Sequence, residues 1–317
     1  MVLWNNSDAL ERIFLLILGG FHGLKTVHAW LLIPFCLAYL VAFIGNITNL
    51  SVVWNESSLH QPMYYLLSIL AIIDLVMSMS TFPRVLAALW WEALEIQMGA
   101  CFAQLFFIHT FTFLQSSMLL AMAFDRFMAI CHPPHYSSIL TNDIIGKTGL
   151  GCLLRSAGVV MPTPILLRCY HYCHANVLSH PFCLHQDILK LSCSDASVNN
   201  ICGLCVVIIT LGTDSVFTHL SYVLILQAAL GIASAEERLK ALNTCLSHVC
   251  VVLNFFVPLI GVCMVHRFGK KLPPIVHILM ADNDLLLPPV RNPIIYSIRT
   301  KQIPRGIIHM FRQRRRL

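Results

Sequence analysis

The charged side chains that stand inside long apolar stretches are the residues of this sequence best placed to do chemistry. An ionisable group in hydrocarbon is costly, so it normally faces other helices and has a partner there. Carboxylates in such positions can relay protons or ions, or they can lock helices together. For Asp74 the polar candidates are Asn46 and Asn292, and in a helix bundle the lock is favoured. The charged residues placed in this way are Asp74, Arg155, Asp214, Asp282, Asp284 and Arg291.

A second group of reactive side chains lies between residues 168 and 197. Cysteine and histidine bind soft metals well, but cysteines outside the cytoplasm are usually oxidised to disulfides. We favour disulfides, because an oxidised cysteine cannot serve as a thiolate ligand, and we predict no metal and no cofactor. The residues in this group are Cys169, His171, Cys173, His174, His180, Cys183, His185 and Cys193.

The composition identifies the elements that must position these groups. Of the 317 residues, 57% are hydrophobic and only 11% are charged, and the mean hydropathy is +0.73. So few charges cannot cover a water-facing surface, which argues against a soluble enzyme, a disordered chain or a nucleic-acid-binding protein. The sequence also lacks a Walker loop, a His-Glu-x-x-His motif and a Gly-x-Ser-x-Gly motif, so no enzyme is predicted.

Uncharged or nearly uncharged runs of membrane-spanning length predict an all-α membrane protein with a bundle of seven helices. A short amphipathic helix is expected to follow the bundle, because Ile303, Ile307, Ile308 and Phe311 recur at helical spacing among basic residues. The predicted spans are 29–54, 62–86, 101–130, 146–167, 198–227, 241–265 and 274–298.

The basic tail predicts the orientation. Residues 299–317 contain seven of the 21 Lys and Arg residues and no acid, which places this tail at the cytoplasmic membrane surface near anionic lipids. An odd number of spans then puts residues 1–28 outside, with residues 29–298 as the membrane domain. Asn5 begins an Asn-Asn-Ser glycosylation sequon in that outer segment, whereas the sequon at Asn55 falls on the inner side.

Several motifs resemble those of one known family. Residues 122–131, Met-Ala-Phe-Asp-Arg-Phe-Met-Ala-Ile-Cys, resemble the third-helix signature of olfactory receptors, which are rhodopsin-like G-protein-coupled receptors. One match would mean little, but six in the right order are specific. Residues 106–109, 183–187 and 265–269 further resemble the class I, fish-like branch, subfamily 51 or its neighbours. The other motifs are Gly45-Asn46, residues 59–65, Ser221-Tyr222, residues 240–248 and residues 292–296.

The resemblance implies a receptor of the plasma membrane, with its N-terminus outside and its C-terminus inside, that binds an odorant and activates an olfactory stimulatory G protein to raise cyclic AMP. Trafficking chaperones are further expected partners, and nucleic acid is not. It also implies disulfides between Cys101 and Cys183 and between Cys173 and Cys193, which leaves Cys169 without an assigned partner. The residues implied in G-protein coupling and activation are Asn46, Asp74, Asp125, Arg126, Tyr222, Asn292, Pro293 and Tyr296.

Spacing and resemblance together predict a ligand site in the outer half of the bundle. Helical periodicity puts the span-six residues on one face, and a guanidinium at its end suits a carboxylate. Class I receptors are associated with water-soluble odorants, including short carboxylic acids, so a carboxylic acid is one expected ligand. Arg267 could equally be a solvated loop charge, and His109 a structural histidine. The predicted ligand-binding residues are His109, His185, Gln186, Phe256, Ile260, Cys263 and Arg267.

Some residues depart from the family pattern. Pro134 and His135 follow the third-helix signature where the family usually has Leu and Arg, and Arg291 replaces an apolar residue. Asp284 and Arg291 are seven residues apart, so they share a helical face and could pair. The intramembrane charges leave a second hypothesis open, an ion-coupled transporter or channel, and the Cys and His residues leave a third, a membrane enzyme.

Overall fold

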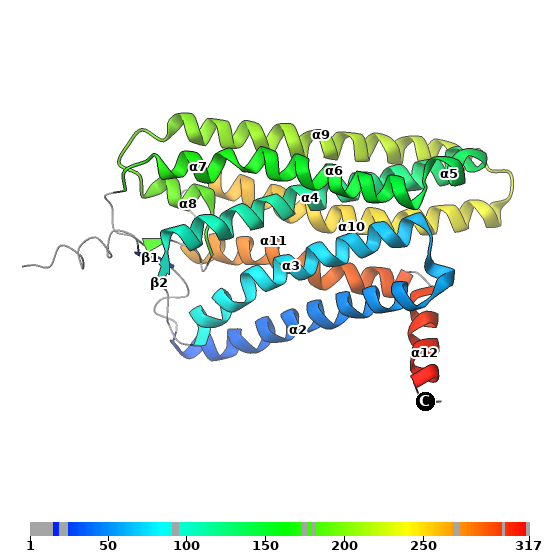
Figure 1. Ribbon diagram of the computed structural model, residues 1–317, viewed down its shortest axis with the longest axis horizontal. Helices are drawn as coiled ribbons and strands as arrows, with labels where there is room; N and C mark the ends of the chain where they lie inside the picture. The colour runs from blue at the N-terminus through cyan, green and yellow to red at the C-terminus, as the bar shows by residue number, and fades with distance from the viewer. Residues whose placement is uncertain are drawn as a thin grey trace, which may run out of the picture.

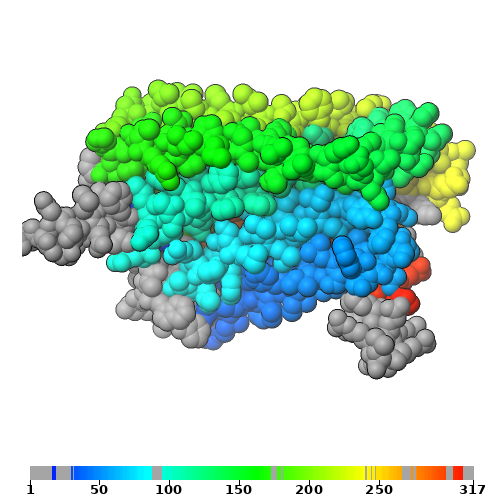
Figure 2. Space-filling model, viewed as in Figure 1, coloured from blue at the N-terminus to red at the C-terminus, as the bar shows by residue number. Residues whose placement is uncertain are grey.

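The computed structural model describes residues 15–18, 25–90, 95–172, 177–178, 180, 182–268, 273–299 and 302–314. Seven long helices lie side by side in this described part of the chain (Figure 1). Figure 2 shows that the side chains of α2, α3, α4 and α6 close one face of the bundle along its length. The predicted all-α bundle is confirmed. Its long helices are α2 (Lys25–Asn55), α3 (Pro62–Trp90), α4 (Met98–Cys131), α6 (Asn142–Val160), α9 (Ser197–Leu230), α10 (Ala235–Phe268) and α11 (Pro274–Arg299).

Apolar composition explains why these segments are helices. A helix pairs its backbone N–H and C=O groups with one another, and this is required in a membrane because hydrocarbon offers these groups no hydrogen-bond partner. By length and composition, six candidate membrane spans occur among the described helices. Helix α11 is not among the six; it contains Asp282, Asp284 and Arg291.

The fourth predicted span is broken, which the sequence analysis did not foresee. Helix α6 ends at Val160, and the short helix α7 (Pro162–Arg168) follows. Pro162 lacks a backbone N–H and its ring obstructs the carbonyl four residues earlier, so a proline suits the first turn of a new helix. At the end of the bundle that the sequence predicts to face the cytoplasm, called the inner end below, the 3-10 helix η1 (Ser57–Leu59) joins α2 to α3, and α5 (Pro133–Ile139) follows α4.

The opposite end, which the sequence predicts to lie outside and which is called the outer end below, carries a small sheet that was not predicted. Strand β1 (Leu15–Leu18) pairs antiparallel with β2 (Glu95–Gln97) and parallel with β3 (Val177–Leu178). The buried side chains of Leu16, Leu18 and Leu178 pack beneath it. Part of the predicted outer N-terminal segment is therefore a strand, and α2 begins at Lys25 rather than at residue 29.

The opposite end carries the short helix α12 (Gln302–Arg314), which turns away from the bundle (Figure 1). Its apolar side is partly covered, since Ile303 is buried while Ile308 is exposed. His309 Nδ1 lies 2.5 Å from Glu56 Oε1, so α12 is attached to the inner end of α2.

Candidate ligand cavity and signalling residues

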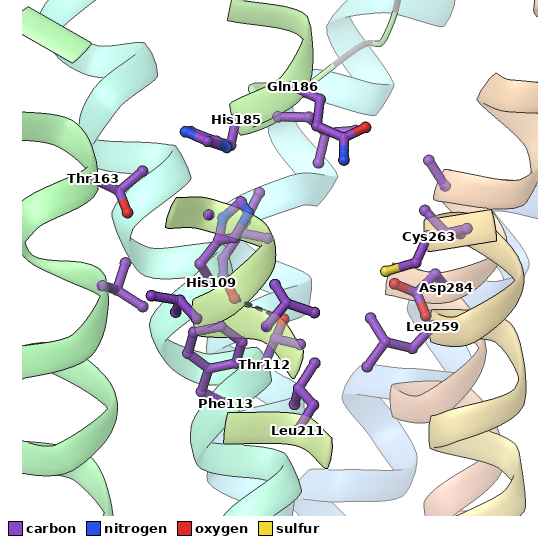
Figure 3. Close-up of a pocket in the computed structure, with 18 of the residues that line it drawn as sticks. His109, Thr112, Phe113, Thr163, His185, Gln186, Leu211, Leu259, Cys263 and Asp284 are labelled. Atoms are coloured by element: carbon purple, nitrogen blue, oxygen red, sulfur yellow. Dashed lines mark hydrogen bonds between the residues drawn. The ribbon is translucent and has the colours of Figure 1, made fainter. Parts of the chain in front are cut away.

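A cavity of about 160 Å³ lies between α4, α9, α10 and α11 in the outer half of the bundle (Figure 3). Residues at the start of the helix α8 (His185–Lys190) line its outer side. The lining is mostly apolar, which is typical of small-molecule sites. The apolar lining includes Ile108, Phe113, Val160, Phe182, Leu184, Leu204, Val206, Val207, Leu211, Leu259, Val262, Ala281 and Leu285.

A disulfide holds the outer loop on the bundle. It joins Cys101 at the start of α4 to Cys183, with the two Cα atoms 5.5 Å apart. Gln104, which the sequence analysis missed, reinforces the joint. Its side-chain oxygen accepts a hydrogen bond from the backbone N–H of Cys183 at 3.2 Å, and its Nε2 donates to the Ser80 carbonyl at 3.1 Å. The residues after Cys183 are thereby placed over the cavity.

Of the other three cysteines of the loop, the structure describes two, Cys169 and Cys193. Cys193 is disulfide-bonded, whereas Cys173 lies outside the described residues, so their pairing stays a prediction. Cys169 is a free, exposed thiol. Among the described residues no group of three or more His, Cys, Asp and Glu side chains could hold a metal ion.

Both predicted histidines line the cavity. His109 Nδ1 lies 2.9 Å from the Leu105 carbonyl oxygen, so this nitrogen donates and Nε2 is left as the acceptor of a neutral ring. The ring of His185 approaches α9 at Gly203, where a Cβ would come within 2.9 Å of its Cε1 atom. The pKa of His185 is lowered to about 4, chiefly by burial and to a smaller extent by the nearby ring of His109. His185 is therefore a neutral group at physiological pH.

The predicted face of α10 is wrong in part. Cys263 lines the cavity, but Ile260 is 57% exposed on the outer surface of the helix, and the buried Phe256 packs in the core beside Phe255. Leu259 and Val262 line the cavity instead. The bundle-facing and lipid-facing sides of α10 are both apolar, so periodicity could not identify the inner side. The side chain of Arg267 lies outside the described residues, and Gln186 does line the cavity.

Asp284 also lines the cavity, although the sequence analysis did not include it among the ligand residues. Figure 3 shows its carboxylate beside Cys263 and Leu259 on the side opposite His109. The predicted pair of Asp284 with Arg291 is wrong. Seven residues span about 10.5 Å of helix, and Arg291 Nη1 donates instead to Asn254 Oδ1 at 3.2 Å.

The Asp74 group in the middle of the bundle has the geometry of a lock. Asn292 Nδ2 donates to Asp74 Oδ2 at 2.9 Å, and Gln115, which was missed, donates to Oδ1 at 3.4 Å. Asn46 makes no direct bond to Asp74. Its Nδ2 donates to the Pro289 carbonyl at 2.9 Å, so Asn46 also connects α2 to α11. These bonds join α2, α3, α4 and α11 at one level.

The same level contains a close backbone approach. A Cβ on Gly45 would lie 2.8 Å from the Pro293 ring, so a larger residue would push α2 and α11 apart. Pro293 directly follows Asn292, so the close packing of Gly45 on Pro293 holds the backbone next to the Asn292–Asp74 hydrogen bond.

The inner end of the bundle holds the predicted coupling residues. Arg126 Nη2 and Asp125 Oδ2 are 2.5 Å apart, and the Tyr136 hydroxyl of α5 donates to Asp125 Oδ1 at 2.9 Å. The Tyr222 hydroxyl of α9 is bonded to His248 of α10. The Tyr296 hydroxyl of α11 donates to the Met122 sulfur at 3.8 Å. The pair with Asp125 holds the Arg126 side chain, which is 14% exposed, and the bonds of Tyr222 and Tyr296 connect α9 to α10 and α11 to α4 at the same end.

A third polar group joins α4, α6 and α9. Arg155 Nη1 donates to Asp214 Oδ1 and to Ser117 Oγ, both at 2.9 Å. Ser116 and Ser117 donate to Asp214 Oδ2 at 3.0 and 3.2 Å. The sequence predicted that Arg155 and Asp214 need partners, but it could not show that they pair with each other.

The arrangement defines a class of fold, the seven-helix bundle of rhodopsin type. The crystal structure of squid rhodopsin superposes with a TM-score of 0.72, covering 91% of this chain and 86% of that chain at 18% identity. At this identity the likeness concerns the fold alone.

Sequence comparison gives the particular family. The olfactory receptor family model matches residues 35–314. Human "Olfactory receptor 51L1" is 73% identical over 99% of both chains, and human "Olfactory receptor 51G2" is 52% identical over 98% of both. The chain belongs to the olfactory receptor family. It is therefore a multi-pass membrane receptor of the G-protein-coupled class rather than an enzyme, and its predicted membership of subfamily 51 is confirmed.

Proposed function

We propose that the chain binds a small odorant in the cavity between α4, α9, α10 and α11. On binding, it would activate an olfactory stimulatory G protein and so raise cyclic AMP. The observation that carries this proposal is the cavity itself, which is mostly apolar and lies at the end of the bundle away from Arg126. A cavity of about 160 Å³ is close to the size that accommodates benzene in an engineered protein core. The odorant is accordingly small.

The proposed mechanism requires that the helix bundle exists in two conformations in equilibrium. A ligand shifts such an equilibrium only by binding one arrangement more tightly. Leu259 and Cys263 of α10 line the cavity, while His248 of the same helix contacts Tyr222 near the inner end. An odorant that draws the outer part of α10 inward would favour an arrangement in which the inner part moves outward. Arg126 would then be free to meet the alpha subunit of the G protein.

The sequence predicted a carboxylic acid held by Arg267. The described lining contains no Lys or Arg side chain, so that preference rests on the sequence alone. The proposal places the receptor in the plasma membrane, where residues 1–28 form the outer segment, residues 29–298 the receptor domain and residues 299–317 the basic tail on anionic lipid. Trafficking chaperones would assist its delivery.

The test is cyclic AMP in cells that express the chain with an olfactory stimulatory alpha subunit and a trafficking helper. A panel of small acids, alcohols, aldehydes and amines is applied, with surface staining in parallel. A response that disappears in Arg126→Ala at unchanged surface level supports the proposal.

Helix α9 offers a matched pair of variants for the cavity. Gly203→Ala should weaken the response at least tenfold, because the new methyl group displaces His185. Gly212→Ala on the same helix should leave the response unchanged, since nothing lies within 4 Å of its Cβ position. Equal potency in both variants, or silence across the panel at normal surface level, would overturn the proposal.

A further inference from the structure

The most unusual group in the cavity is the carboxylate of Asp284. Three other carboxylates of the bundle are engaged: Asp74 by Asn292, Asp125 by Arg126 and Asp214 by Arg155. Asp282, the other acid of α11, lacks a hydrogen-bond partner among the described residues, but it does not line the cavity. Asp284 has no hydrogen-bond or ion-pair partner among the described residues. An ionisable side chain in such a place normally has a partner, so the missing partner points to a bound molecule.

The polar lining near Asp284 is suited to a ligand that donates hydrogen bonds. The neutral ring of His109 presents Nε2 as an acceptor, because Nδ1 is committed to Leu105. His185 carries no charge near pH 7, since burial lowers its pKa to about 4. The described lining holds no Lys or Arg side chain, so an anionic ligand would meet a carboxylate there without a described cation to offset it.

We propose that the cavity takes a small primary amine whose ammonium group pairs with Asp284. The inference rests on the proposed function, because it names the ligand class of the same cavity. An alkylammonium has a pKa near that of lysine, about 10.4, so it enters as a cation. It supplies three donors, and the pair is stronger in a cavity sheltered from water than in bulk water. Figure 3 shows Asp284 at one side, with Leu259, Leu211 and Phe113 around the space for the apolar tail.

The test compares three odorants that share one carbon chain: pentylamine, 1-pentanol and pentanoic acid. Cyclic AMP is measured in the same cells at equal surface level. Pentylamine should act at a concentration at least tenfold lower than 1-pentanol, and pentanoic acid should be weakest. Asp284→Asn keeps the shape of the side chain but removes its charge, so it should abolish the preference for the amine and keep the response to 1-pentanol.

Helix α11 supplies the control. Asp282 is also a carboxylate and is 4% exposed, but it does not line the cavity. Asp282→Asn should therefore preserve the preference for pentylamine. If the two variants behave alike, or if pentanoic acid is the strongest of the three, the inference is overturned while the receptor function stands.

A direct binding measurement separates this inference from the signalling proposal. The purified receptor in detergent is heated with and without pentylamine, and its unfolding temperature is recorded. An increase with pentylamine that is larger than with 1-pentanol, and absent in Asp284→Asn, supports the inference even if cyclic AMP does not change. No increase with pentylamine overturns it, whatever the signalling assay gives.

Discussion

The charges on α11 differ from those elsewhere in the bundle. Asp282 is buried, and neither of its oxygens has a hydrogen-bond partner among the described residues. Asp284 faces the cavity, and among the described residues the hydrogen-bond partner of Arg291 is a neutral asparagine, Asn254. A charge near the middle of a membrane helix costs about 2.5–3.5 kcal/mol on insertion scales. Helix α11 is therefore the element of this receptor that enters the membrane least readily.

We predict that His185 makes receptor stability sensitive to mild acid. Its pKa in the folded chain is about 4, chiefly because of burial, with the nearby ring of His109 as a second cause, whereas an unfolded histidine has a pKa of about 6.5. The unfolded chain thus binds the proton more tightly. The contribution of the neutral His185 to the free energy of unfolding should be fully present above pH 6.5, and it should decrease as the pH falls towards 4.

The measurement is the unfolding temperature of the purified receptor between pH 7.5 and pH 4.5. The decrease should be smaller in His185→Gln, which cannot take up the proton. The Asp187 carboxyl should not contribute to this decrease between pH 7.5 and pH 4.5. Burial would raise its pKa, but the hydrogen bond and charge of His180 and the charge of Lys190 outweigh burial and hold it well below the usual range. Its stabilisation is therefore lost only at lower pH. Parallel curves for the two proteins would contradict the prediction.

At the scale of elements, the sequence predicted most helices to within a few residues of their ends. Spans two and seven begin at Pro62 and Pro274 in both the prediction and the structure. Continuous apolar runs identify a membrane helix because hydrocarbon leaves the backbone few alternatives. The break before Pro162 and the three short strands were missed. The strands come from segments far apart in the chain and are only two to four residues long.

The candidate site was harder to predict than the helices. Four predicted residues do line the cavity: His109, His185, Gln186 and Cys263. For α10, however, periodicity predicted that Ile260 faces the bundle, whereas Ile260 is exposed and Leu259 lines the cavity. Both sides of a membrane helix are apolar, so the pattern that orients a soluble helix is weak here. The sequence identified Asp284 as a charged residue within a membrane span, but only the structure shows that it lines the cavity.

We predict a strong coupling between Arg155 of α6 and Asp214 of α9. The side chain of Asp214 is 4% exposed, while that of Arg155 is 41% exposed. Arg155→Met leaves a buried carboxylate without its cation, which typically costs about 3–5 kcal/mol. Asp214→Asn should also destabilise the receptor, because it leaves the guanidinium of Arg155, near the middle of a membrane span, without its carboxylate. The double variant Arg155→Met/Asp214→Asn should recover much of the loss.

The measurement is the surface level and the unfolding temperature of the four proteins in this cycle. Lys147→Met is the matched control on α6, since Lys147 pairs with Asp143 where both side chains are more than 70% exposed; it should change little. Losses that simply add in the double variant would show that the two residues do not act as a pair.

At the scale of the whole molecule, the two ends of the bundle differ in kind. One end carries the sheet, the Cys101–Cys183 disulfide and the cavity. The other carries α12 and the basic tail, with seven Lys and Arg among residues 299–317. Disulfides form in oxidising compartments, and basic segments favour the cytoplasmic surface. Both features agree with the proposed orientation, which has the cavity outside the cell and α12 inside.

We predict from this that the chain carries one glycan at Asn5 and none at Asn55. Asn5 lies in the proposed outer segment, whereas Asn55 ends α2 at the inner side and donates a hydrogen bond to the Ser51 carbonyl at 2.6 Å. Treatment with a glycosidase should therefore increase the electrophoretic mobility of the expressed receptor. Asn5→Gln should have the same effect without the enzyme, and Asn55→Gln should have none.

Antibody tags at the two ends give an independent measure of the orientation. An N-terminal tag should stain intact cells, and a C-terminal tag should stain only after the membrane is made permeable. The reverse pattern would put the cavity on the cytoplasmic side, where an external odorant could reach it only by crossing the membrane. It would also put Cys101 and Cys183 in a reducing compartment, where their disulfide would not persist. The orientation therefore decides whether the cavity can serve as a sensor of external molecules.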